Sequence, residues 1–572
     1  MGTKAKLKIN NSAIKLLIII GTVTWSLVMI KSGLIYSFGK GFWGPNGHDG
    51  VWHIALINHL ANGNWQMPVF AGETLRNYHV GYDLLLAILH RITTIPAETL
   101  YFQIIPPIIA FLTGFLTYKF VYLWKKSKIQ AFWATFFIYF AGSFGWVISL
   151  AREGQIGGES LFWSQQAIST LINPPFALSV VLILLGLIGL LKLKKSSTIW
   201  CLLAISLIFG ILAQIKVYAG ILSLGGLFIA GLYEFIKRKK TTLIKVFVIS
   251  SIFAALFFFP LNQNAVGLIV FRPFWFLETM MGLSDRFYWP RFAEAMVNYR
   301  LGNIWYKAIP AYFIAFLIFV VGNMGIRIIK APLMVQWFRK YKKLSFIEIF
   351  FAVVIFFGII FPMFFLQKGT PWNTIQFFYY SLTFSGIFAG VVFGEWLERK
   401  GQRSINILGI IIIILSIPTT VATLKHYLPS RPPAKISNEE LEALSFLSKQ
   451  SDGIVLTYPF DREAAKQALA NPPRPLYLYE STAYVSAFSE KIVYLEDEVN
   501  LDITGYDWRG RREKVELFLK IPNQEEARSF LEENNISYIY WIIGQRAILG
   551  ESQLGITKIF ENSEVDIFAV NN

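Results

Sequence analysis

The sequence predicts an α-helical polytopic membrane protein with about 11 transmembrane helices and a C-terminal α/β domain. Of its 572 residues, 54% are hydrophobic and only 16% are charged, which is too little charge to solvate a globular protein of this size. The formal net charge is +17, yet residues 430–572 carry 15 Lys and Arg against 23 Asp and Glu. A basic membrane part therefore precedes an acidic soluble part, and membrane topology explains the basic residues better than nucleic-acid binding.

Eleven apolar runs are long enough to cross a hydrocarbon core as helices. The run at 80–89 is too short to span and carries Asp83, so we expect a re-entrant or interfacial helix there. The first run follows a lysine-rich start without a small-residue cleavage site after it, which predicts an uncleaved anchor. The eleven runs cover residues 13–30, 98–123, 131–150, 176–191, 198–215, 217–236, 243–261, 305–329, 346–366, 375–396 and 405–424.

Basic clusters follow every second apolar run. Lys and Arg accumulate in cytoplasmic loops. This parity therefore predicts a protein of the cytoplasmic (cell) membrane whose N-terminus faces the cytoplasm and whose C-terminal domain lies outside the cell. The outward loops are then 31–94, 151–175, 262–304 and 367–374. The basic clusters lie at 125–128, 192–195, 237–240, 339–343 and 399–403.

A proline-rich linker at 429–433 divides the chain. Residues 1–428 form the predicted transmembrane module, which includes the outer loop 31–94, and residues 434–572 form the predicted soluble α/β domain. Within that domain a capping-box pattern of Ser437 and Glu440 opens a helix at 437–450. A second helix is predicted at 524–534, and strands are predicted at 453–458, 491–495, 537–542 and 564–570.

The first outer loop gathers residues that can do chemistry. Five of the six histidines lie between residues 48 and 90. An amphipathic helix is predicted to begin near Asp49 and to stop at Asn62-Gly63, which puts Asp49 and His53 on one face and His48 about 100° away. Two interpretations stay open. Asp49 is a general base tuned by histidine, or a ligand, with His48 and His53, of a divalent cation such as Mg²⁺ or Mn²⁺; alternatively it is the helix N-cap and the histidines are interfacial polar residues.

This layout resembles the GT-C superfamily of membrane glycosyltransferases. The resemblance rests on the uncleaved first span, on Asp49 and His53 in the first outer loop, on the Tyr78-His79 element before a short apolar run, and on the C-terminal outer domain. It implies a hexosyl- or pentosyltransferase that moves a sugar from a polyprenyl-phosphate carrier to a glycan, lipid or protein acceptor. It also implies that Asp49 is the catalytic base, the one residue role that carries over from the family. His53, Tyr78 and His79 are candidates for contacts with substrate.

One part of the family pattern is missing from the first outer loop. Many GT-C members have a second acidic residue beside the first or in the next loop. In this chain Asp49 is followed by Gly50, and the next outer loop offers only Glu153 and Glu159 as loose candidates.

Two lysines lie in short outward turns. Lys216 separates the fifth and sixth apolar runs, and Lys368 lies in the loop 367–374. A cation at membrane depth is costly unless it meets an anion, so we expect both to bind the phosphate of the carrier; snorkelling to the interface is the alternative. Arg286 and Trp372, in the outer loops, are candidates for sugar or phosphate contacts, and an ordinary surface role or the interfacial aromatic belt is the alternative.

Two other classes of function fit the composition. A transporter or flippase for lipid-linked sugars is disfavoured because the apolar runs hold few ionisable residues and the chain has no visible repeat. A non-catalytic membrane anchor that presents the outer domain should tolerate loss of Asp49. The glycosyltransferase hypothesis requires that carboxylate.

Overall fold

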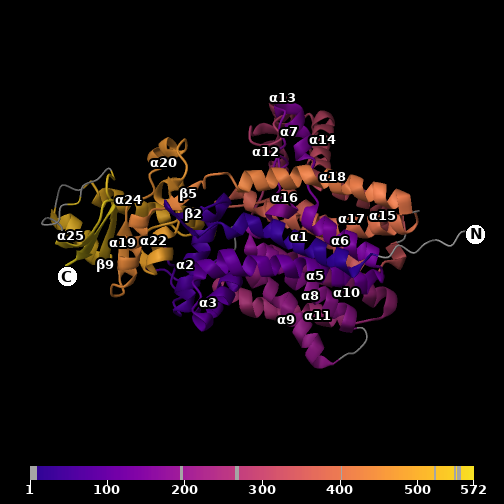
Figure 1. Cartoon of the computed structure of the whole chain (residues 1–572), viewed down its shortest axis with the longest axis horizontal. Coiled ribbons are helices and arrows are strands. Elements are labelled where there is room, and N and C mark those ends of the chain that lie inside the picture. The colour runs from indigo at the N-terminus through magenta and orange to yellow at the C-terminus, as the bar shows by residue number, and fades with distance from the viewer. Residues whose placement is uncertain are drawn as a thin grey trace, which may run out of the picture. The chain divides into compact units, whose positions relative to one another are not determined.

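The computed structural model describes residues 9–193, 198–263, 269–339, 341–400, 402–520, 524–545, 549 and 555–571. The lysines at 4, 6 and 8, at 194 and 195, and at 340, on which the predicted topology draws, lie outside these ranges. The chain forms two compact units. Figure 1 shows the chain coloured by residue number. Unit 1 comprises residues 1–28, 106–260 and 269–427, and unit 2 comprises residues 29–105, 261–268 and 428–572.

Unit 1 is a bundle of apolar helices. Within the described ranges, nine helices of the chain are long and apolar enough to cross a membrane, or ten if one bent pair counts as a single span. This confirms the predicted class of polytopic helical membrane protein. The long helices are α1 (Asn11–Ile30), α5 (Ile105–Lys125), α8 (Pro174–Leu193), α10 (Val217–Arg238), α11 (Thr242–Phe258), α14 (Trp305–Met324), α16 (Phe346–Phe364), α17 (Gln376–Glu398) and α18 (Gln402–Tyr427).

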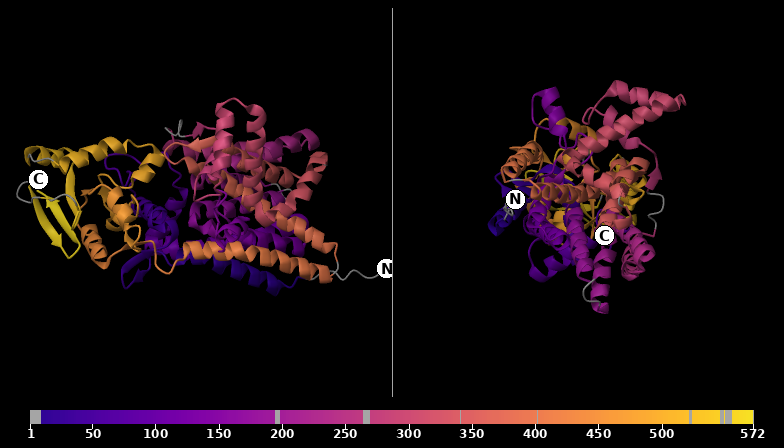
Figure 2. Two further views of the ribbon diagram at one scale, coloured as in Figure 1. Left: turned by 90° about the horizontal axis from the view of Figure 1, so that it is seen from above. Right: turned by 90° about the vertical axis from the view of Figure 1, so that its right-hand side faces the viewer.

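The helices of unit 1 pack in a continuous series. Helix α17 packs against α6 (Lys128–Phe140) and α16, α16 packs against α10, and α9 (Ile199–Ile215) packs against α8, α10 and α11. Figure 2 shows the chain, including this helical bundle, from two further directions. The α9 helix is apolar but has only 17 residues and is not among the nine, whereas α11 continues through a 3₁₀ turn to Leu261. Shorter elements of unit 1 are α7 (Gly145–Glu153), β3 (Ile269–Phe271), α12 (Trp275–Gly282), α13 (Pro290–Leu301), α15 (Ala331–Arg339) and β4 (Phe365–Gln367).

The apolar run at 131–150, predicted as one helix, is broken. Helices α6 and α7 meet at an angle of 45°. A Cβ on Gly142 would lie 2.3 Å from Thr419 Cβ, and one on Gly145 would lie 1.8 Å from the carbonyl oxygen of Gly158. The backbone therefore approaches two neighbours at positions that only glycine fills, and the helix breaks where it does so.

Unit 2 combines the first outer loop with the C-terminal residues. A four-stranded sheet joins the two segments, in the order β1 (Ile35–Tyr36), β2 (Gly39–Phe42), β5 (Ala434–Ile436) and β7 (Arg474–Pro475). Trp43 Nε1 donates to the carbonyl oxygen of Pro429 at 3.0 Å, so the linker is fixed to the loop within this unit. Helices α2 (Asp49–Ala61) and α3 (Gly81–Thr93) pack on each other. Helix α3 corresponds to the apolar run at 80–89, which was predicted not to span the membrane.

The C-terminal part of unit 2 is an α/β fold, as predicted. Its five-stranded sheet has the order β10 (Ile556–Glu561), β11 (Val565–Val570), β9 (Ile536–Ile542), β6 (Ile454–Thr457) and β8 (Ile492–Val493). Strands β9, β6 and β8 are parallel, and β10 and β11 are antiparallel additions. Figure 1 shows α19 (Asn438–Ser448) and α25 (Gln524–Glu533) on opposite sides of the sheet. The remaining helices are α20 (Arg462–Ala468), α21 (Leu476–Tyr479), α22 (Tyr484–Ser489), α23 (Glu498–Thr504) and α24 (Trp508–Phe518).

Candidate active site

Asp49 is the first residue of helix α2, as the sequence predicted. The chain enters this helix through a 3₁₀ turn, Gly44–Gly47, that has Pro45 in its first turn. Gly50 is required by packing, because a Cβ there would lie 2.6 Å from the ring of Phe102. The helix cap is His48, whose side chain makes no capping hydrogen bond. The alternative in which Asp49 is itself the N-cap therefore does not describe this helix.

Helix α2 differs from its prediction in one respect. It was expected to be amphipathic, but every residue from Gly50 to Ala61 is buried. It packs against α3 on one side and against α22 on another, so its polar face meets protein and not water. His59, on that polar face, contacts Ser486 Oγ at 3.1 Å, and burial lowers the pKa of His59 to about 4.

His48 lies between two carboxylates. Its Nδ1 is 3.0 Å from Oδ1 of Asp49, and its Nε2 is 3.2 Å from Oδ1 of Asp497. Burial acts against the charged imidazole, but Asp497, Asp49 and Glu480 outweigh it and hold the pKa of His48 well above its usual range. Both ring nitrogens therefore donate, as only the imidazolium can do.

The two carboxylates differ sharply in exposure. The side chain of Asp497 is 0% exposed, whereas that of Asp49 is 55% exposed. Asp497 also accepts from the backbone N–H and the side-chain amide of Asn500, at 3.0 and 2.8 Å, and so caps helix α23. The buried carboxylate is thus held on several sides, and it anchors the imidazolium that contacts the accessible carboxylate.

His53 belongs to a neighbouring cluster. Its Nδ1 is 2.6 Å from Oδ1 of Asp83, and its ring stacks on Tyr101 with centroids 5.2 Å apart. Tyr78 packs edge-on against Trp52, with centroids 5.5 Å apart, and His79 stacks on Tyr78 at 4.7 Å. His53, Tyr78 and His79 thus lie in the same unit as Asp49. His48, and not His53, contacts the Asp49 carboxylate.

Beside Asp49, the carboxylate that also contacts His48 comes from a distant part of the chain. Sequence reasoning missed Asp497 and Glu480, and it proposed Glu153 and Glu159 instead. In unit 1, Glu159 is buried and accepts from Ser169 Oγ and from the backbone N–H of Gln166, and burial raises its pKa to about 7. A usable signal for Asp497 was the acidic run Glu496-Asp497-Glu498, which follows directly on the predicted strand 491–495.

The three predicted metal ligands are not arranged as a ligand set. Both nitrogens of His48 meet carboxylates, and Nδ1 of His53 meets Asp83. Within the described ranges no group of three His, Cys, Asp or Glu side chains is placed to hold a metal ion. A divalent cation stays a prediction from the sequence, and the proposed sugar transfer does not depend on one.

The remaining predicted residues lie in unit 1. Lys216 is the single residue between α9 and α10, as predicted, and it is 6% exposed. Its neighbour Tyr218 donates to Gln367 Oε1 at 3.2 Å, next to Lys368. The Lys216 turn and the Lys368 loop therefore meet. Trp372, in the same loop as Lys368, is 49% exposed.

Arg286 has structural partners. Its guanidinium lies 4.1 Å from the ring centroid of Trp163 and 3.3 Å from Asp285. These contacts fit the surface role that the sequence left open for it, and they leave the substrate role a prediction.

Comparisons with known proteins concern the fold. No protein-family model matches the chain, and no curated protein matches its sequence. Solved structures do match. The oligosaccharyltransferase AglB from Archaeoglobus fulgidus, in complex with an inhibitory peptide and a dolichol-phosphate, is 13% identical with a TM-score of 0.50, covering 93% of this chain and 69% of its own. The same enzyme in complex with Zn and sulfate has a TM-score of 0.50 at 13% identity, covering 92% of this chain and 68% of its own.

A second enzyme matches over the whole chain. The arabinofuranosyltransferase AftD from Mycobacteria is 11% identical with a TM-score of 0.54, and the match covers 100% of this chain and 41% of AftD. The chain thus spans about two fifths of that enzyme. Both neighbours are membrane glycosyltransferases of one superfamily. This chain therefore has the GT-C fold.

Proposed function

We propose that this protein transfers a sugar from a polyprenyl-phosphate carrier to an acceptor, with Asp49 as the general base. The observation that carries the proposal is the exposed Asp49 carboxylate beside a buried His48 imidazolium, which Asp497 holds from the other side. The GT-C fold supports membrane glycosyl transfer as the general activity. The carrier, the base and the phosphate ligands are parts of the proposal.

Sugar transfer needs a base at the acceptor. The acceptor hydroxyl must lose its proton as it attacks the anomeric carbon, and a carboxylate in reach of that hydroxyl can accept the proton. Asp49 is accessible to a substrate, and His48 fixes its orientation through a charge-assisted hydrogen bond. Asp497 and Glu480 keep His48 protonated, so the positioning group retains its charge at neutral pH. His53, Tyr78 and His79 are proposed to contact the sugar.

The leaving phosphate needs a cation. AglB was solved with a dolichol-phosphate, and we extend a lipid-phosphate donor to this chain by proposal. Lys216 and Lys368 are the proposed ligands, because the contact of Tyr218 with Gln367 brings their two segments together. Charge grows on the phosphate as the sugar leaves, so a cation there stabilises the transition state more than the ground state.

The deciding experiment compares two carboxylate variants in purified protein with a short-chain polyprenyl-phosphate sugar donor. Asp49→Asn keeps the size of the side chain and removes its basicity, so we expect transfer to fall by a factor of about 10² or more. Glu73→Gln is the matched control, since Glu73 lies in the same outer loop and pairs with Arg76 at the surface. Parental transfer by a folded Asp49→Asn variant would contradict the proposal. Vesicle transport without sugar transfer would indicate the flippase class.

A further inference from the structure

The C-terminal α/β fold contains a cavity of its own. Its volume is about 260 Å³, just below the usual range of about 300–1,000 Å³ for small-molecule sites. It lies where the parallel strands β6, β9 and β8 end, since Thr457, Ile542 and Leu495 line it. Ligands of α/β sheets bind outside the carboxyl ends of parallel strands. The cavity therefore occupies the part of this fold where a ligand is expected.

Aromatic rings and neutral polar groups share the lining. Tyr458, Tyr477 and Tyr540 contribute rings, and Gln467 and Gln545 contribute amides. Such a combination suits a ligand with apolar faces and many hydroxyl groups, because the rings cover the faces and the amides both donate and accept hydrogen bonds.

A buried hydroxyl in the cavity lacks a protein partner. Thr482 is 3% exposed and lines the cavity, and among the residues that the structure describes its hydroxyl oxygen has no hydrogen-bond partner. Tyr540 also lines the cavity and is 1% exposed, but its hydroxyl interacts with Tyr484. Buried polar groups are almost always paired, so the Thr482 hydroxyl calls for a partner from outside the protein.

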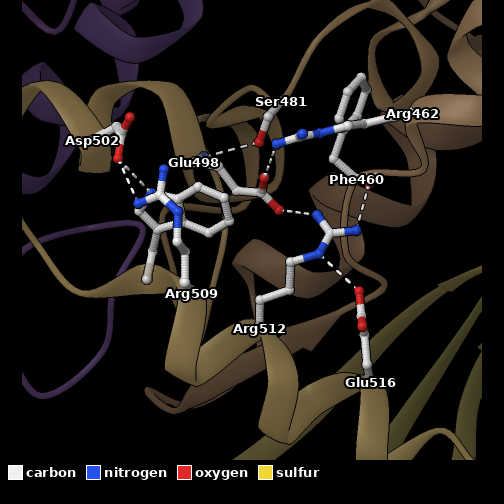
Figure 3. Close-up of polar contacts among 9 residues, drawn as sticks. Phe460, Arg462, Ser481, Glu498, Asp502, Arg509, Arg512 and Glu516 are labelled. Carbon is white, nitrogen blue, oxygen red and sulfur yellow. Dashed lines mark hydrogen bonds and ion pairs between the residues drawn. The ribbon is translucent and has the colours of Figure 1, made fainter. Parts of the chain in front are cut away.

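The two arginines beside the cavity pair with acidic residues of the protein. Figure 3 shows Arg512 on α24 and Arg462 on α20 directed at the carboxylate of Glu498. Arg512 also donates to the carbonyl oxygen of Phe460 at 3.0 Å and to Glu516 at 2.8 Å. The two arginines are therefore engaged within the protein, and they do not form an open site for phosphate.

A second buried carboxyl group of the lining is also satisfied. Glu496 accepts from the backbone N–H groups of Val485 and Ser486, at 2.8 and 3.1 Å, at the start of α22. Burial raises the pKa of Glu496 to about 8, so this carboxyl group is mostly neutral at pH 7. Two further carboxyl groups line the cavity: Asp461 caps α20, and Glu480 acts on the charge of His48. The described lining holds no Lys or Arg, so the cavity offers no cation to an anionic ligand.

We infer that this cavity binds a neutral sugar residue. A pyranose or furanose ring presents apolar faces to Tyr458, Tyr477 and Tyr540, and one of its hydroxyls pairs with Thr482. A second cavity of about 480 Å³ shares Tyr458, Pro459 and Asp461 with the first, so a glycan has room to continue beyond one residue.

The cavity adjoins the candidate active site within unit 2. Glu496 and Glu498 line the cavity, and Asp497 between them contacts His48. Glu480 lines the cavity and acts on the charge of His48. If the proposed function holds, the bound glycan is part of the acceptor. Binding itself is measured without a donor, so a failure of the binding inference and a failure of the transferase proposal are distinguishable.

Binding is tested on the full chain in lipid nanodiscs, because sugar-headed detergents would compete. The probes are glucose, galactose, mannose and arabinose, titrated by saturation-transfer difference NMR. Thr482→Val removes a hydroxyl that has no protein partner among the described residues, so this variant should melt at the parental temperature or above it. We expect it to weaken binding of the preferred sugar about fivefold to tenfold.

Tyr538→Phe is the control, since it also removes one hydroxyl. Tyr538 lies on β9, its hydroxyl bonds with Ser451, and it does not line the cavity. The sugar affinity of Tyr538→Phe should equal that of the parent. The inference is overturned if no neutral sugar binds saturably, or if Thr482→Val binds the sugar as tightly as the control. Saturable binding of inorganic phosphate or methylammonium in place of sugar would also overturn it.

Discussion

His48 and Asp497 lie 449 positions apart in the sequence, and their Nε2 and Oδ1 atoms are 3.2 Å apart in the structure. The contact joins the first outer loop to the segment between β8 and α23. It also places a second carboxylate beside His48, whereas in the sequence Asp49 is followed by Gly50. The positioning of Asp49 thus depends on residues near the end of the chain.

The charge of His48 should stabilise unit 2 in a pH-dependent way. Its folded pKa is raised above the usual 6.5, so the stabilisation is complete below about pH 6.5 and is lost as pH rises through the folded value. Removing one partner from a buried pair leaves an uncompensated carboxylate at Asp497, which costs about 3 to 5 kcal/mol. We expect His48→Asn to lower the melting temperature most at pH 6 and least at alkaline pH.

The measurement is the difference in melting temperature between the parent and His48→Asn from pH 6 to 10. His90→Asn is the control, since the His90 ring contacts the carbonyl oxygen of Ile95 and no carboxylate in the described contacts. A difference that stays constant with pH would show that His48 is neutral.

Lys216 should act on the donor phosphate. Lys216→Ala is expected to lower turnover and donor affinity, by about tenfold or more in kcat/KM, because a charge-assisted hydrogen bond is lost. Lys216→Arg should keep part of the activity, since the charge is retained while the shape changes. Lys368→Ala should have a smaller effect, because Lys368 is exposed.

The control for the lysine series is Lys307→Ala. Lys307 lies against the rings of Tyr299 and Tyr306 in the same unit, outside the two turns. All variants are compared in one assay with a short-chain donor. Equal rates for the parent, Lys216→Ala and Lys307→Ala would support snorkelling as the role of Lys216.

The topology predicted from charge parity is open to a direct test. Helix α18 separates Lys400 from the linker, so reporters fused after Lys400 and after Pro433 should lie on opposite sides of the membrane. We expect the first to report cytoplasm and the second to report the exterior. If both reporters lie on the same side, α18 does not span the membrane.

Local patterns in the sequence predicted much of the fold. The capping box of Ser437 and Glu440 is present at the start of α19, and α2 begins at Asp49, because such signals involve neighbouring residues. The bend between α6 and α7 was missed, because its cause is the approach of Thr419 and Gly158 to two glycines. The His48–Asp497 contact was missed for the same reason, since a single sequence carries no record of which distant segments meet.

Glu496 should make the stability of unit 2 fall as pH rises from about 4.5 to about 8. The folded carboxyl group holds its proton up to a pKa of about 8 because it is buried, whereas in the unfolded chain it ionises near its usual 4.5. Between these values the folded state binds the extra proton, so the free energy of unfolding decreases with pH. Glu496→Gln cannot ionise, and it should lose this slope.

The same variant carries a constant cost. Glutamine has one acceptor oxygen, so it can satisfy only one of the N–H groups of Val485 and Ser486, which costs about 1 to 3 kcal/mol. Denaturation of the parent and Glu496→Gln at several pH values between 5 and 8 separates the two effects. Glu532→Gln is the control, because Glu532 forms a surface pair with Arg528 and should leave the slope unchanged. A slope that is equal in the parent and Glu496→Gln would mean that Glu496 is ionised in the folded protein, and that the neighbouring sugar cavity carries a negative charge.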